Sequence, residues 1–155
     1  MSKGTEPSEP IRIGGCVLGA SATLRVFGNA LDPGEITRLL GQVPTSSYRT
    51  GDPVSPRVTS RRKMGMWRLE SSLSRTEPLS HHVTELLVGL PSDSTIWSEI
   101  HKRFSADVYC AVNVSVPNSG MGLTSEALEA LAMRKLSVEF DFYALLEEEA
   151  TSQVE

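Results

Sequence analysis

Hydrophobic and polar side chains alternate along several stretches of the chain, which is the pattern of a strand with one buried face and one exposed face. The alternation is clearest at residues 106–116, where Val108, Cys110 and Val112 fall on one side and polar side chains fall mostly on the other. Three further stretches alternate in the same way, and a short fourth one is also expected to be extended: residues 22–28, 66–72, 136–143 and, shorter, 46–50. The pattern therefore predicts five strands.

The same alternation assigns the large side chains of these strands to a face. Trp67 shares a side with Leu69, so it should point into the core. In the last strand the apolar side is formed by Leu136, Val138, Phe140 and Phe142. Residues 11–18 are apolar but contain two adjacent glycines, so they predict either an extra edge strand or a segment that covers the core.

Helical spacing of apolar residues occurs four times. The first helix, residues 33–40, is specified at both ends, because Asp32 is a good N-cap, Pro33 suits the first position and Gly41 can adopt the left-handed conformation. The others are a helix at about 80–90 with Ser80 as a possible cap, a helix from Asp93 or Ser94 to about 104, and a helix capped by Thr124 with Ala127, Leu128, Leu131 and Ala132 inward.

The elements follow the order strand, helix, strand, strand, helix pair, strand, helix, strand. The first six have the βαββαβ order of a ferredoxin-like fold, and the last helix and strand are expected to extend the same sheet. The sequence therefore predicts an α+β fold. We expect a two-layer sandwich in which a mixed or antiparallel sheet carries its helices on one face.

Several short features occur in a characteristic order: residues 24–28, 39–41, 43–45, 49–52 and 65–67, His82, and residues 140–143. Together they resemble the bacterial family catalogued as domain of unknown function 4279, over about residues 22–144. The resemblance implies a fold and no catalytic residues, because the activity of that family is unknown. The chain differs from the family pattern in a long Arg-rich insert between Asp52 and Met64.

Residues 54–63 fall within that insert and contain Pro56, Arg57 and a run of three cations at 61–63. Proline and clustered like charges disfavour regular structure, so this stretch predicts a long, exposed and mobile loop. Charge is uneven elsewhere too, since the C-terminal end is purely acidic. Such blocks are usually solvated surfaces.

Composition limits the class of protein. With 155 residues, 39% hydrophobic and 22% charged, the chain fits a single α+β domain at 11–145, between a disordered leader at 1–10 and an acidic tail at 146–155. The net charge of −4 argues against a general nucleic-acid binder. Since no apolar run approaches the roughly 18 residues that span a bilayer, no membrane partner is expected.

The two cysteines, Cys16 and Cys110, have no neighbouring ligands at metal-binding spacing. Neither a zinc site nor a disulfide framework is indicated, so we expect two free thiols, no metal and no cofactor. Because the residues before Cys16 are polar, a lipoprotein signal is not indicated either. The cytoplasm is the expected location.

Candidate binding residues gather after the first helix. Thr45, Ser46, Arg49 and Asp52 combine hydroxyls, a guanidinium and a carboxylate, and Arg68 closes the same basic region. An arginine in such a group could bind a carboxylate or a phosphate. The alternative is local: the hydroxyls bond loop backbone, and Arg49 pairs with Asp52.

A second candidate surface is the polar side of the last two strands. Tyr109 and Asn113 lie on one of them, and Tyr143 lies on the other with Glu139 and Asp141. Acids and tyrosines on a solvated sheet face suit a basic protein partner.

No catalytic residue is predicted, because no Ser, Cys or Asp lies in a recognisable nucleophile motif. His81 and His82 are adjacent on a predicted helix and point about 100° apart, so they are not expected to chelate a metal together. The sequence favours a non-catalytic interaction protein, of the immunity or accessory kind, that binds a protein through the polar sheet side or the 49–68 region. The alternatives are a small-molecule or anion-binding module using Arg49 and its neighbours, and an enzyme whose site assembles across the sheet. The sequence leaves the oligomeric state open.

Overall fold

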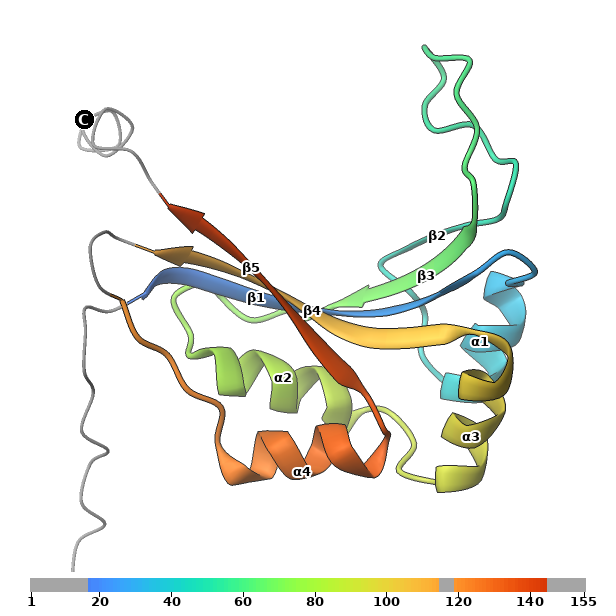
Figure 1. Ribbon diagram of the computed structural model, residues 1–155. Helices are drawn as coiled ribbons and strands as arrows, with labels where there is room; N and C mark the ends of the chain where they lie inside the picture. The colour runs from blue at the N-terminus through green and yellow to red at the C-terminus, as the bar shows by residue number, and fades with distance from the viewer. Residues whose placement is uncertain (1–16, 115–118, 145–155) are drawn as a thin grey trace, which may run out of the picture.

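Five strands form one mixed sheet, and four helices lie against a single face of it (Figure 1). The computed structural model describes residues 17–114 and 119–144. In chain order the elements are β1 (Val17–Gly28), α1 (Pro33–Leu40), β2 (Ser46–Tyr48), β3 (Gly65–Glu70), α2 (Leu79–Val88), α3 (Ser94–Arg103), β4 (Ser105–Val114), α4 (Ser125–Met133) and β5 (Ser137–Ala144). The predicted α+β class, the mixed sheet and the helices on one face are confirmed.

The strands are arranged in the order β2-β3-β1-β4-β5. All neighbours are antiparallel except β4 and β5, which are parallel and are joined through α4. β1 is the central strand of the sheet and is longer than predicted, because residues 19–21 also pair with β4. The register shifts between Gly19 and Val17, and Val17 still pairs with Val114. Residues 17–18, predicted to belong to a separate edge segment, are therefore the start of this central strand.

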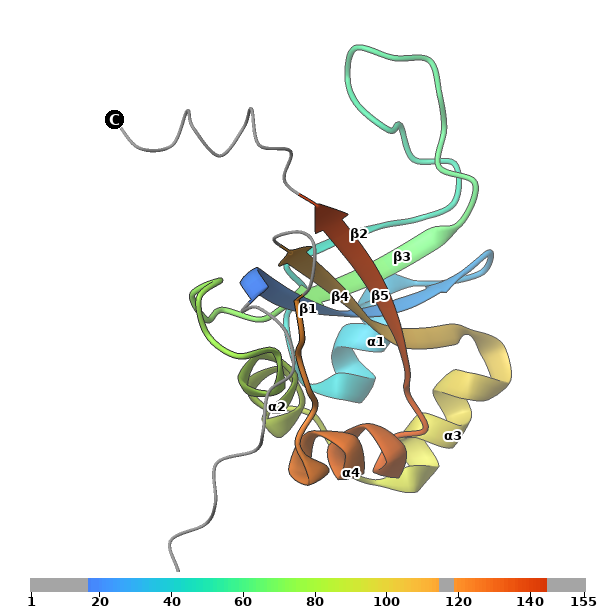
Figure 2. The same cartoon turned by 60° about the vertical axis from the view of Figure 1, so that its left-hand side comes forward.

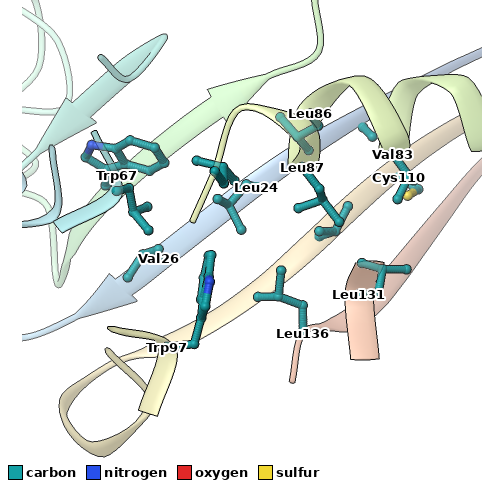
Figure 3. Packing of buried hydrophobic residues seen from close by; sticks show 14 of the residues in the cluster. Leu24, Val26, Trp67, Val83, Leu86, Leu87, Trp97, Cys110, Leu131 and Leu136 are labelled. Carbon is teal, nitrogen blue, oxygen red and sulfur yellow. The ribbon is translucent and has the colours of Figure 1, made fainter. Parts of the chain in front are cut away.

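The core lies between the sheet and the helices (Figure 3). Trp67 is fully buried, as strand parity predicted, and its ring nitrogen donates a hydrogen bond of 3.0 Å to the hydroxyl of Thr37 on α1. Val108, Cys110 and Val112 of β4 are also fully buried on this side. The alternation in the sequence thus assigned the inward face of the central strands correctly.

Helix α1 begins and ends as its sequence predicts. The carboxylate of Asp32 accepts a hydrogen bond from the Gly34 N–H, and Gly41 has φ +67° while its N–H bonds the Thr37 carbonyl at 2.9 Å. The caps predicted at Asp93 and Thr124 are also confirmed, at 2.8 Å to the Thr95 N–H and 3.3 Å to the Ala127 N–H.

Ser80 was wrongly predicted to cap α2. The helix begins one residue earlier, after Pro78, and the buried Ser80 hydroxyl instead joins α2 to the segment before α4. It accepts a hydrogen bond of 2.9 Å from the Thr124 N–H and donates one of 3.3 Å to the Gly122 carbonyl. Pro78 occupies the N-cap position of α2 with no side-chain cap hydrogen bond, and Ser80, inside the helix, makes a tertiary contact.

Fewer apolar residues of β5 and α4 are buried than the sequence predicted. Phe140 and Phe142 lie on the helix side of the sheet, yet they are 41% and 57% exposed and stack on each other, because β5 is an edge strand. On α4, Ala127 and Leu131 are buried, whereas the predicted inward residue Leu128 is 51% exposed. Ala132, also predicted to face inward, is exposed as well.

The basic insert forms a hairpin arm, defined here as residues 49–64, that rises from β2 and β3 on the side away from the helices (Figures 1 and 2). Backbone hydrogen bonds of 2.8 Å join Gly51 to Arg62 and Arg62 to Asp52, and a further one of 3.0 Å joins Val54 to Ser60. Most of the arm is exposed, as predicted, but these bonds give it the paired backbone of a hairpin where an irregular loop was expected.

The predicted leader at 1–10, the acidic tail at 146–155 and Cys16 lie outside the described residues. Cys110 is a free thiol, as predicted, and burial raises its pKa to about 12. Within residues 17–114 and 119–144, no helix has the length and apolar character that a membrane crossing needs.

Candidate functional site

The sheet has an open face, defined here as the side that carries no described helix. Strand pairing brings many polar and aromatic side chains onto it: Ser46 and Tyr48 from β2, Met66, Arg68 and Glu70 from β3, Thr23, Arg25 and Phe27 from β1, Asp107, Tyr109 and Asn113 from β4, and Glu139, Asp141 and Tyr143 from β5. Five of the eight predicted site residues therefore share one surface: Ser46, Arg68, Tyr109, Asn113 and Tyr143.

Two tyrosines hold one carboxylate on the β4–β5 part of this face. The hydroxyls of Tyr109 and Tyr143 each donate a hydrogen bond of 2.7 Å to the same oxygen of Asp141, and the two hydroxyls are 3.1 Å apart. The hydrogen bonds with Tyr143 and Asp141 raise the pKa of Tyr109 above its usual range. The hydrogen bonds from Tyr143 and Tyr109 lower the pKa of Asp141, so its charged form is stabilised.

An ion pair between β1 and β4 lies beside these tyrosines. The guanidinium of Arg25 binds the carboxylate of Asp107 through two hydrogen bonds of 2.7 and 2.6 Å, and it lies 4.8 Å from the centre of the Tyr109 ring. The bond to Asp107 raises the pKa of Arg25 despite its partial burial. Bidentate geometry and aromatic contact fix both charges in place.

Sequence reasoning missed Arg25 and Asp107 as site residues. Both occupy the polar side of predicted strands, but nothing in the sequence says that they are opposite each other across β1 and β4. Only the register of the two strands brings them together.

The arm contributes one arginine to the open face. The guanidinium of Arg62 lies 4.0 Å from the centre of the Tyr48 ring, on the β2 edge of the sheet. Arg57, Arg61 and Lys63 are exposed on the arm, so this end of the molecule is basic while the β5 end carries Glu139 and Asp141.

The other predicted site residues are not on the open face. The Thr45 hydroxyl bonds strand backbone, and not the loop backbone expected, since it accepts from the N–H of Glu70 at the end of β3 at 2.9 Å. The guanidinium of Arg49 pairs with Asp32 at the start of α1, so the predicted ion pair between Arg49 and Asp52 is wrong. The carboxylate of Asp52 accepts instead from the backbone N–H of Arg49 at 2.7 Å and closes the turn.

The described histidines do not form a metal site. His82 is fully buried and its Nδ1 lies 2.5 Å from the Ser71 hydroxyl, whereas His81 is exposed and faces Glu77. No group of three or more potential His, Cys, Asp or Glu ligands is present in the part of the chain that the structure describes. His101 is half-buried and bonds the Arg134 carbonyl at 2.9 Å, so it also has a structural partner.

A family model described as Domain of unknown function (DUF4279) matches residues 19–145. The match includes all five described strands, apart from the first two residues of β1. The chain belongs to this family. The match to domain of unknown function 4279 confirms the resemblance seen in the sequence and covers the whole open face. No curated protein and no solved structure matches the chain. Membership of DUF4279 therefore shows the family of the chain but not its function.

Proposed function

We propose that the protein is a non-catalytic interaction module that binds a protein partner through the open face of its sheet. The observation that carries the proposal is the asymmetry of the fold, in which all four helices lie on one side and the polar, tyrosine-bearing side is left without a described helix (Figures 1 and 2). Open sheet faces can remain solvated, but this one holds its large side chains in fixed cross-strand contacts.

Fixed side chains favour binding because less conformational entropy is lost when a partner docks. Tyr109 and Tyr143 are held by Asp141, and Arg25 is held by Asp107. Tyrosine and arginine are also the residue types that contribute most to protein interfaces. The centre of the face thus has the composition and the order of a preorganised contact surface.

The charges on the open face and the arm indicate what kind of partner surface would be complementary. The β4–β5 part carries the acidic residues Glu139 and Asp141. The arm carries three exposed basic residues, which are Arg57, Arg61 and Lys63. A partner with basic side chains over the first part and acidic side chains over the second would be complementary to both. We therefore propose a protein with such a two-signed surface as the partner, in an immunity-like or accessory role.

The fold and location can be proposed in more detail. The order β2-β3-β1-β4, with antiparallel neighbours throughout, supports a ferredoxin-like unit that β5 extends through α4. A buried free thiol at Cys110 supports a cytoplasmic location, where thiols stay reduced. Neither nucleic acid nor membrane is part of the proposal.

One of the earlier alternatives loses support. An anion site at Arg49 is disfavoured because its guanidinium already pairs with Asp32. The contact between Ser71 and His82 gives no support to an enzyme whose site assembles across the sheet, because the imidazole is fully buried.

Site-specific photo-crosslinking in cells of the native host tests the proposal. A photoreactive amino acid is placed at Asn113 on the open face and, as the matched control, at Glu129 on the exposed side of α4. We expect a discrete protein adduct from Asn113 that weakens at least tenfold when Tyr143→Ala is added. An adduct from Glu129 alone, equal adducts from both positions, or no adduct from Asn113 would contradict the proposal.

A further inference from the structure

The strand β5 forms one edge of the sheet, since β4 is its one neighbour among the described strands (Figure 2). An edge strand presents a row of backbone N–H and C=O groups that point away from its neighbour. The described residues supply no hydrogen-bond partner for these outward groups of β5. The opposite edge, β2, has three residues, whereas β5 has eight and so presents a longer row of such groups.

The two sides of β5 carry different chemistry. Phe140 and Phe142 lie on the helix side, where they are 41% and 57% exposed and stack with their ring centres 5.9 Å apart. Glu139 and Asp141 lie on the open face, and Glu139 is exposed with no ion-pair partner among the described residues. Exposed aromatic rings beside an edge backbone mark a surface on which another strand can pair.

The acidic residues disfavour a second copy of the chain at this edge. If two copies of β5 paired antiparallel with Phe140 opposite Phe140, Glu139 would be opposite Asp141. If Phe140 were opposite Phe142, Asp141 would be opposite itself. Like charges directly opposite each other are destabilising, so charge opposes both registers. A strand with Lys or Arg at these positions is favoured instead.

We propose that β5 binds an extended segment of a protein partner, which adds to the sheet as a further strand and in which apolar side chains alternate with Lys or Arg. The apolar side chains cover Phe140 and Phe142, and the basic ones lie opposite Glu139 and Asp141. In such strand addition, main-chain hydrogen bonds give affinity and alternate side chains give specificity. The strand addition rests on the proposed function, which supplies the protein partner, and it names the segment of that partner and the edge that holds it.

The probe is a seven-residue peptide, blocked at both ends, in which Lys and Val alternate. It is added to the full chain at low ionic strength while NMR follows the amide signals of residues 137–144, and we expect saturable shifts of these signals. A peptide in which Glu replaces Lys should not bind, because its charge matches that of β5.

Backbone methylation separates strand addition from simple charge attraction. One version of the peptide is N-methylated at its Lys residues and another at its Val residues, so each lacks the N–H donors along one edge of the extended peptide. The version methylated on the edge that faces β5 should bind at least tenfold more weakly, and the other should bind nearly as well as the parent peptide. Equal affinities of the two versions would overturn the proposal.

Variants of β5 test the side-chain contacts. Phe142→Ser should weaken binding of the parent peptide at least tenfold, and Glu139→Gln should weaken it severalfold. Val88→Ser on α2 and Glu99→Gln on α3 are the matched controls, because both side chains are exposed on helices. Each control should change the affinity less than twofold, and amide spectra of every variant should show the native fold. A loss in Glu99→Gln as large as in Glu139→Gln would overturn the proposal.

Hydrogen exchange of the protein without peptide tests whether the edge is open. We expect alternate amides of residues 137–144 to exchange rapidly, because they point away from β4. Slow exchange of all these amides would overturn the proposal. Protection that rises with protein concentration would identify a second copy at the edge, and protection independent of concentration would identify another part of the chain.

The crosslinking experiment at Asn113 separates this proposal from the proposed function. An adduct at Asn113 in cells without peptide binding to β5 would overturn the strand addition and leave the open-face proposal standing. Peptide binding to β5 without an adduct at Asn113 would support the edge site and contradict the open-face proposal.

Discussion

Gly65 and Gly28 are partners across β3 and β1, where the chain leaves little room for a side chain. A Cβ added at Gly65 would lie 3.1 Å from both the Cβ and the carbonyl oxygen of Leu31, and 3.3 Å from the carbonyl oxygen of Gly28. Two of these neighbours are backbone atoms, which cannot move as a flexible side chain can. Steric crowding therefore explains why the residue at this position of the family pattern is glycine.

We expect Gly65→Ala to lower the free energy of unfolding by about 1–3 kcal/mol, the usual cost of overpacking. Gly122→Ala is the control, because a Cβ there meets nothing within 4 Å. Urea denaturation of both variants measures the difference. Equal midpoints for the two variants would show that the strand shifts freely at Gly65.

Arg134 is a buried cation whose partners are all backbone carbonyls. Its guanidinium donates to the carbonyls of Leu87 and Leu90 at 3.1 Å, of Pro91 at 3.2 Å and of Ala130 at 2.9 Å. It thus binds the carbonyl ends of α2 and α4, where helix dipoles favour positive charge. Burial lowers the pKa of Arg134, and these carbonyls offset part of that cost.

Replacing Arg134 with methionine keeps the stem but leaves these carbonyls without their donor. Because hydrogen bonds from charged groups contribute about 1.5–3 kcal/mol, we expect Arg134→Met to destabilise the fold by at least that amount. Lys102→Met, at an exposed position of α3, should change stability by less than about 0.5 kcal/mol. Thermal unfolding compares the two, and a melting temperature for Arg134→Met within error of Lys102→Met would refute the role.

At the scale of elements, the β4–β5 pair is tied on its open side by Tyr109, Asp141 and Tyr143. The raised pKa of Tyr109 means that its protonated form is stabilised in the folded state. This contribution is complete below the ordinary tyrosine pKa of about 10 and is lost as pH rises through the folded value. The lowered pKa of Asp141 acts at the other end: its contribution is present above the ordinary aspartate pKa and is lost as pH falls through the folded value.

We therefore expect Tyr109 to stay protonated at pH values where an unperturbed tyrosine ionises. The ring Cζ chemical shift of Tyr109, followed by NMR from pH 8 upward, measures this directly. Tyr143→Phe and Asp141→Asn should each bring the pKa of Tyr109 back toward about 10. Ser46→Ala, on the far side of the open face, should leave it unchanged, and an ordinary titration in the unaltered protein would contradict the network.

The hairpin arm is the second element with a testable consequence. Arg57 lies near the tip of the arm, between Ser55 and Val58, and it is exposed. Limited trypsin digestion should cut first after Arg57, with Arg61 and Lys63 following, and leave the sheet and helices folded. Mass spectrometry of the earliest fragments identifies the site. A first cut after the buried Arg134 would show that α4 opens more readily than the arm.

At the scale of the whole molecule, the sequence predicts the features that depend on neighbouring residues only. Alternation placed Trp67, Val108 and Cys110 in the core, and capping chemistry set both ends of α1. It could not predict contacts between elements, such as the pairs of Arg25 with Asp107 and of Arg49 with Asp32. Strand register and loop conformation determine these pairs, and neither can be predicted from the local pattern of hydrophobic and polar residues.

The same distinction applies to the candidate site. The polar side of β4 and β5 was identified from alternation alone, because side-chain parity is a local property. The positions of Arg62 and Tyr48 depend on how the arm folds back on β2, so residue type alone could not bring them together. Phe140 and Phe142 were assigned to the correct side, but their exposure depends on β5 being an edge strand.

If the open face is the functional surface, the affinity for the partner captured from Asn113 must depend on residues of that face. The dissociation constant is measured by calorimetry for the unaltered protein, for Tyr143→Ala and for the control Glu129→Ala on α4. Tyr143→Ala should weaken binding at least tenfold, whereas Glu129→Ala should change it less than twofold, and both variants should stay folded. A tenfold loss in Glu129→Ala with full affinity in Tyr143→Ala would place the functional surface on the helices instead of the open face.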